Sequence, residues 1–124
     1  MASFTELEVW KQARNIRLLV KDVADRFPPE EKFRLVDQII RSSRSIGNNI
    51  AEGHGRYNYQ DNIRSCVMAR GSLSETLDHL IIAYDEQLIT AEKYDSLKYE
   101  DDKCLKLLNG YIVHLRNSKI EVNI

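Results

Sequence analysis

One segment of this chain reads Ser45-Ile46-Gly47-Asn48-Asn49-Ile50-Ala51-Glu52-Gly53-His54-Gly55-Arg56 and joins two long helical patterns. Its first half continues the apolar spacing of a helix, and its second half contains two glycines close together. Glycine readily adopts the left-handed backbone conformation that ends many helices, so Gly53 is expected to take that conformation. The segment therefore predicts the end of one helix, a tight turn and the start of another helix.

Upstream of this turn, the pattern predicts a helix over about residues 30–52. Pro28 and Pro29 end the preceding helix, and Pro29 suits the first position of the new one. At about 100° per residue, apolar and small side chains occupy one arc and polar side chains occupy the other. The apolar arc holds Phe33, Leu35, Val36, Ile39, Ile40, Ser43, Ile46, Gly47, Ile50 and Ala51. The small members of this arc allow a neighbouring helix to approach closely.

The first helix is predicted over about residues 6–26. Thr5 and Glu8 have the spacing of a capping box, and Phe4 and Val9 have that of a hydrophobic staple. Apolar residues then recur at helical spacing. They are Leu7, Trp10, Ala13, Ile16, Leu19, Val20, Val23 and Phe27.

Two more helices are predicted over residues 59–87 and 91–116, with Asn58 and Thr90 as their N-caps. The third helix has the apolar stripe Tyr59, Ile63, Cys66, Val67, Leu73, Leu77, Leu80, Ile81, Tyr84 and Leu88. The connections are short, so consecutive helices should lie antiparallel. The expected fold is all-α: one domain, residues 1–124, forming an antiparallel up-down-up-down four-helix bundle.

Composition narrows the possible functions. The chain has 124 residues, a formal net charge of -1 and 43% hydrophobic residues, which is typical of an ordinary globular protein. The near-neutral charge argues against a strongly basic nucleic-acid binder but allows a local basic patch. The N-terminal residues do not have the pattern of a secretory signal. No apolar run approaches the roughly 20 residues that a membrane-spanning helix needs. The cytoplasm is the expected location, with no membrane partner.

Motifs for enzymatic chemistry are missing from the sequence. None of the histidines follows a glutamate by three residues, as di-iron bundles require, and Cys-x-x-Cys is absent. Cys66 and Cys104 are expected to be reduced core thiols. The run Glu100-Asp101-Asp102 is interpreted as a solvated helix face rather than a cation site. We therefore expect no enzyme, no metal and no cofactor.

The best candidate polynucleotide surface lies on one edge of the second helix. It consists of Arg34, Arg41, Arg44, Asn48 and Arg56. Because acidic residues are interleaved with these arginines, a solvated polar face and a subunit interface are the alternative interpretations.

A second candidate is a structural ion pair. Arg70 falls in the middle of the apolar stripe of the third helix, where an unpaired charge is costly, so Glu52 is proposed as its partner. The alternative is that Arg70 lies at the edge of the bundle and extends into solvent.

Several sequence stretches also carry a resemblance to a known family. They are Val9-Trp10-Lys11-Gln12-Ala13, Phe27-Pro28, Ser45-Ile46-x-x-Asn49-Ile50-Ala51-Glu52-Gly53-x-Gly55-Arg56, and Ala69-x-Gly71-Ser72-Leu73 with Glu75. The chain resembles the four-helix-bundle proteins encoded in intervening sequences of bacterial 23S rRNA genes. More distantly, it is similar to the accessory protein of diversity-generating retroelements.

This resemblance implies a homo-oligomer, with a ring of five subunits as the leading expectation, and it implies no established activity. The first functional hypothesis is a non-enzymatic adaptor or scaffold for RNA or an RNA-bound protein. The second is direct binding of RNA or DNA through the arginine-bearing edge of the second helix. The third is an enzyme whose site forms between subunits.

Overall fold

Four long helices and two short 3-10 turns make up the chain in the computed structural model, which describes residues 3–123 and the side chains of residues 3–119. In order, the elements are η1 (Phe4–Glu6), α1 (Glu8–Ala24), η2 (Pro29–Glu31), α2 (Leu35–Gly55), α3 (Tyr59–Asp85) and α4 (Ala91–Asn123).

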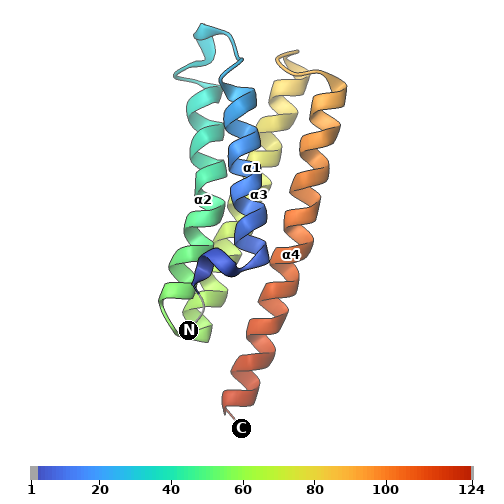
Figure 1. Ribbon diagram of the computed structural model, residues 1–124. Helices are drawn as coiled ribbons and strands as arrows, with labels where there is room; N and C mark the ends of the chain where they lie inside the picture. Colours follow the sequence, from blue (N-terminus) through green and yellow to red (C-terminus); the bar gives the residue numbers. More distant parts are fainter. Residues whose placement is uncertain (1–2, 124) are drawn as a thin grey trace.

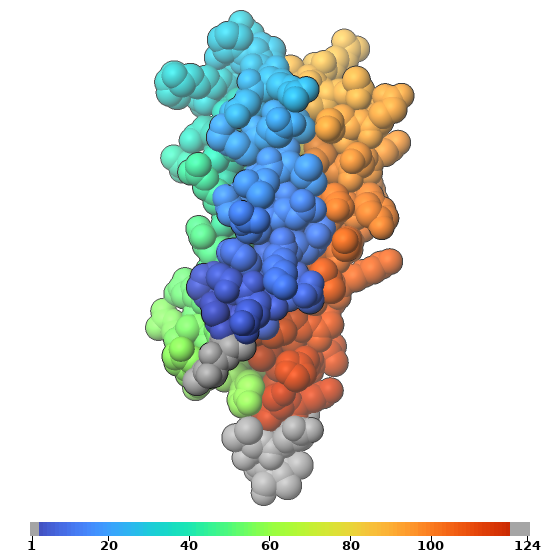
Figure 2. Space-filling view, viewed as in Figure 1, coloured from blue at the N-terminus to red at the C-terminus, as the bar shows by residue number. Residues whose placement is uncertain are grey.

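The helices form an antiparallel bundle, as predicted. Figure 1 shows α1 and α3 running in one direction and α2 and α4 in the other. Each helix packs against its two neighbours around the bundle, with α4 closing the circle against α1, and the most extensive interface lies between α2 and α3. In Figure 2, α1 (blue) crosses the front face and ends well above the lower end of α4 (red). The lower part of the bundle therefore consists of α2, α3 and α4.

Local capping chemistry sets the starts of α3 and α4. The Asn58 side chain accepts a hydrogen bond from the Asp61 amide at 3.0 Å, and the Thr90 hydroxyl accepts one from the Lys93 amide at 3.1 Å. Both predicted N-caps are confirmed. The helix ends differ from the prediction, because α3 ends at Asp85 and α4 continues to Asn123.

The predicted capping box at the first helix is wrong. Thr5 lies inside η1, whose cap is Ser3, and the Thr5 amide donates to the Ser3 hydroxyl at 3.2 Å. As a result α1 begins only at Glu8. Phe4 packs edge-on against Trp10, with ring centroids 5.2 Å apart, so Trp10 takes the position predicted for Val9 in the hydrophobic staple.

The second helix also differs at both ends. Pro29 starts the single turn η2 instead of a long helix, and Arg34 leaves helical geometry with φ -117° and ψ -107°, so α2 begins at Leu35. Phe33 therefore lies outside the helix and is 85% exposed, although it was predicted on the apolar arc.

At its other end α2 passes through Gly53, which is helical and has no positive φ. The predicted left-handed conformation of Gly53 is wrong, and Tyr57 has it instead, with φ 54°. Gly53 is needed for packing: a Cβ there would lie 2.8 Å from Asn62 Oδ1 and 2.8 Å from Ser65 Cβ, so only glycine lets α3 come this close.

The core follows the predicted stripe of α2, where Ile39, Ile46 and Ile50 are fully buried. On α3 the stripe is partly wrong, because Val67 and Ile81 are exposed. Smaller residues of α3 are fully buried instead, and they are Ala69, Thr76 and Ala83.

Small hydroxyl side chains join α2 to α3. Thr76 donates to Ser42 at 2.9 Å, and Ser72 donates to Ser45 at 2.9 Å. These bonds satisfy polar groups where the two helices lie closest. Among the described residues, none of the helices has both the length and the apolar character needed to cross a bilayer.

Candidate functional site

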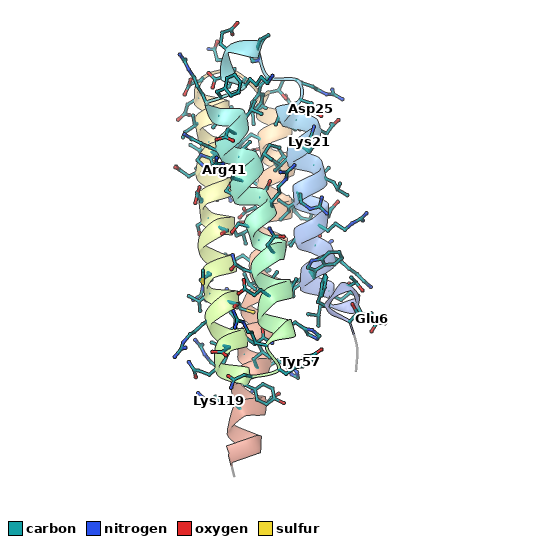
Figure 3. The ribbon with its side chains drawn as sticks, turned by 90° about the vertical axis from the view of Figure 1, so that its left-hand side faces the viewer. Glu6, Lys21, Asp25, Arg41, Tyr57 and Lys119 are labelled. Carbon is teal, nitrogen blue, oxygen red and sulfur yellow. The ribbon has the colours of Figure 1, made fainter. Side chains whose placement is uncertain are left out.

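The five residues predicted as a nucleic-acid surface do not form one patch. Arg34 immediately precedes α2 and Arg56 immediately follows it. A helix of 21 residues is about 30 Å long, so these two arginines lie at opposite ends of the bundle. Figure 3 shows Arg41 in the upper half of the molecule and the turn residue Tyr57 at its lower end.

Two of the predicted arginines are paired with carboxylates of their own helix. Arg41 Nε lies 3.3 Å from Asp37 Oδ1, and Arg56 Nη2 lies 2.9 Å from Glu52 Oε1. All four side chains are largely exposed, so the pairs stabilise the fold little. Their main effect is to reduce the positive field along this edge of α2.

The other two predicted residues, Arg44 and Asn48, lie beside α1. There they line a groove with an open volume of about 230 Å³, which we call the arginine groove. Its lining residues are Trp10, Arg14, Arg17, Arg44, Gly47 and Asn48. The structure thus joins part of the predicted surface to residues of α1 that were not predicted.

Gly47 explains why the arginine groove can form. A Cβ at this position would lie 3.4 Å from Nε1 of Trp10, so the indole rests directly against the backbone of α2. Phe4 also packs edge-on against this indole. The groove therefore combines a packed aromatic ring with three arginines.

The lining of the arginine groove is rich in donors. Among the described residues, no carboxylate lies within 4.0 Å of Arg14, Arg17 or Arg44. In the same part of the chain, these guanidinium groups and the Trp10 indole N–H also have no hydrogen-bond acceptor. Arginine keeps its charge at every physiological pH and offers planar sets of donors. Such a groove suits an anion with several acceptor oxygens, above all phosphate.

A second depression of about 140 Å³ continues the seam between α1 and α2. It shares Arg17 and Arg44 with the arginine groove and adds Lys21. Lys21 is paired with Asp25, whose Oδ2 lies 2.6 Å from Nζ, near the upper end of α1 in Figure 3. The free positive charge is therefore centred on the three arginines.

The structure does not bring Glu52 and Arg70 together. Glu52 pairs with Arg56, and Arg70 donates from Nη1 to Asn109 Oδ1 on α4 at 3.0 Å. This bond is at the exposed edge of the bundle, which agrees with the alternative interpretation that Arg70 extends outward.

Asp101 corrects the interpretation of residues 100–102 as a solvated face. Its side chain is 4% exposed, and its Oδ2 has no hydrogen-bond partner in the described part of the chain. Burial, helped by the neighbouring charge of Asp102, raises the pKa of Asp101 to about 7. Cys66 and Cys104 are buried and free, as predicted, and burial raises their pKa values to about 11 and about 12.

No group of three or more histidine, cysteine or acidic side chains in the described chain is arranged to hold a metal ion. The arrangement that remains is a set of hydrogen-bond donors and positive charges. It can bind and orient an anion.

The fold is that of a four-helix-bundle protein, with a groove lined by three arginines between its first two helices. The chain belongs to the family of 23S rRNA-intervening sequence proteins, whose family model matches residues 5–110. This confirms the resemblance found in the sequence.

The crystal structure of a protein of unknown function from the S23 ribosomal protein family of Bacteroides thetaiotaomicron VPI-5482 is similar to this chain, with a TM-score of 0.78. The two sequences are 28% identical, and the match covers 84% of this chain and 97% of the other. No curated protein matches this chain.

The sequence prediction missed Trp10, Arg14 and Arg17 as site residues. A signal for the arginines exists, because neither Arg14 nor Arg17 has an acidic residue three or four positions away on its helix. Trp10 carried no comparable signal, since its spacing is that of an ordinary core residue.

Proposed function

We propose that this protein is a non-enzymatic, self-associating adaptor that holds the phosphate backbone of RNA or DNA in its arginine groove. The observation that carries the proposal is the set of three unpaired guanidinium groups around Trp10. The chain as a whole has a net charge of -1, so binding would depend on this local charge and not on the overall field. We place the protein in the cytoplasm, where RNA or an RNA-bound protein is its expected partner.

A salt titration with a fluorescein-labelled single-stranded RNA tests this proposal. On a single strand, each phosphate neutralised by an arginine contributes about -0.7 to the slope of log K against log salt, so Arg44→Ala and Arg14→Ala should each reduce the magnitude of the slope by about 0.7. Arg64→Ala is the matched control, since Arg64 is an exposed arginine of α3 that pairs with Asp61 at 3.6 Å. Its slope should equal that of the wild type.

Two results would reject nucleic-acid binding through this groove. The first is no measurable binding of the RNA at low salt. The second is an equal loss of affinity in Arg64→Ala and in the groove variants, because a general loss of positive charge would then explain the effect.

Self-association is supported by apolar side chains that the bundle leaves exposed. On α3, Val67 is 41% and Met68 is 62% exposed, and on α4 Val113 is 53% exposed. By contrast, Trp10 and Tyr84 have aromatic partners within the chain in Phe4 and Tyr94. The interface is therefore expected on the outer faces of α3 and α4.

Light scattering after gel filtration measures the assembly directly. A ring of five subunits has five times the 14.4 kDa of one chain. Introducing charge with Val67→Glu and Met68→Glu should lower the measured mass. Phe33→Glu is the control, because Phe33 is more exposed but lies in the loop before α2. A wild type that runs as one chain at micromolar concentration would exclude self-association.

A further inference from the structure

A separate hollow lies at the lower end of the bundle, where α1 is absent. It has an open volume of about 370 Å³, and we call it the aromatic cleft. Its lining residues are His54, Tyr57, Asn58, Tyr59, Asn62, Tyr111 and Leu115. They come from the end of α2, the following turn, the start of α3 and the second half of α4. Because α1 begins only at Glu8, it does not fill the space between these elements (Figure 1).

Aromatic rings form the walls of this cleft. The His54 and Tyr57 rings lie 6.4 Å apart and are tilted by 58°, and Tyr57 is held in the turn by its left-handed backbone. Figure 3 shows Tyr57 at the same end of the molecule as Lys119 of α4. Flat rings at such an opening offer faces on which another planar ring can stack.

Polar groups lie at the base of the cleft. Asn62 is 8% exposed, and its amide donates to the Tyr111 hydroxyl at 3.2 Å. That bond uses Tyr111 as an acceptor, so the hydroxyl hydrogen has no protein acceptor in the described chain and can be donated to a ligand. The cleft thus combines stacking surfaces with a fixed donor, and no carboxylate lines it.

The aromatic cleft and the arginine groove lie along the same side of α2. His54 follows Gly47 by seven residues, which is two helical turns and about 10 Å along the axis. A positive groove beside aromatic side chains is the arrangement that proteins use for single strands, in which the backbone follows the charge and the bases stack on the rings.

We propose that the aromatic cleft takes an unstacked nucleobase of a single-stranded nucleic acid whose backbone lies in the arginine groove. The base stacks on the Tyr57 ring, with the tilted His54 ring against its rim, and its polar edge accepts the hydrogen bond from Tyr111. This inference rests on the proposed function, since the groove holds the phosphates. It adds the requirement that the ligand have free bases, which an intact duplex does not provide.

The test compares two labelled oligomers of equal length and charge, oligoadenylate and an oligomer without bases. Stacking on an aromatic side chain is worth about 1–3 kcal/mol, so the wild type should bind oligoadenylate about tenfold more tightly than the abasic oligomer. Tyr57→Gly and His54→Ala should remove most of this ratio and leave both the abasic affinity and the salt slope unchanged. Tyr57→Gly should fold, because glycine adopts a φ of 54° without strain.

Tyr99→Ala is the matched control, because Tyr99 is 68% exposed and does not line the cleft. Its base-dependent ratio should equal that of the wild type. An unchanged ratio in Tyr57→Gly and His54→Ala overturns the inference, and so does a wild type that binds both oligomers equally.

A second measurement separates this inference from the proposed function. Adenosine has no phosphate, so it should shift the amide signals of residues 54–62 in an NMR titration and leave the Trp10 indole signal unchanged. If adenosine binds there and the abasic oligomer does not bind, the groove proposal fails and a base site remains. If groove variants weaken the oligomers while the cleft variants and adenosine have no effect, only the base site fails.

Discussion

Replacing Asp101 by asparagine should stabilise the folded chain above neutral pH. The carboxylate is buried, its Oδ2 has no partner in the described chain, and its pKa is raised from 3.8 to about 7. Asparagine has nearly the same shape and carries no charge. The substitution therefore removes the cost of burying an ionised group and changes the packing little.

The sign of the pH dependence follows from the two pKa values. Between pH 3.8 and about 7 the folded state keeps the Asp101 proton while the unfolded chain loses it, so the free energy of unfolding decreases as the pH rises. A shift of about three units corresponds to at most about 4 kcal/mol, reached fully only above pH 7. Nearly half of this is already lost at pH 5, so the change from pH 5 to pH 8 is about 2–3 kcal/mol.

Urea unfolding followed by circular dichroism at pH 5 and pH 8 measures this difference. The wild type should lose about 2–3 kcal/mol more stability between the two pH values than Asp101→Asn does. Asp95→Asn is the control, because Asp95 is an exposed carboxylate of the same helix and its variant should follow the wild type. Parallel pH profiles for Asp101→Asn and the wild type would refute the reasoning, whatever the absolute stability of the variant.

Three further predictions concern packing and backbone. Gly53→Ala should destabilise the fold by about 2–3 kcal/mol in urea unfolding, because the new Cβ would overlap α3. Gly55→Ala is the control and should be neutral or slightly stabilising, because a Cβ at Gly55 would have no neighbour within 4 Å. Equal effects of the two substitutions would contradict the close contact at Gly53. Gln87→Gly should stabilise the fold by about 1 kcal/mol, because Gln87 follows the C-cap Glu86 of α3 with φ 62°. A calorimetric scan showing no gain would argue against strain there. Cys66 and Cys104 should react with iodoacetamide only when the chain is unfolded, and rapid labelling of the native protein would disagree with their burial.

The apolar period predicted the helices because it reflects which side of each helix is removed from water. On α2 the predicted residues Leu35, Ile39, Ile46 and Ile50 are all buried. The caps at Asn58 and Thr90 were also predictable, because a cap is formed within a few residues of sequence.

What the local sequence could not show was the distance between helices. Gly53 looks like a helix terminator in one dimension, but in the structure it is the point where α2 meets α3 without a side chain between them. Asp101 was misplaced for a similar reason. Consecutive residues of a helix point about 100° apart, so in a run of three acidic residues on a packed helix at least one can face inward.

The candidate site was half predictable, and the missing half follows from a simple rule about pairing. Arg41 and Arg56 have an acidic residue four positions earlier, and both are paired in the structure. Arg14, Arg17 and Arg44 have no acidic residue three or four positions away in either direction. Helical ion pairs form at these spacings, so an arginine without them keeps its charge available. Because the three arginines also line the seam between α1 and α2, folding places them around one groove, where a bound anion would reduce their mutual repulsion.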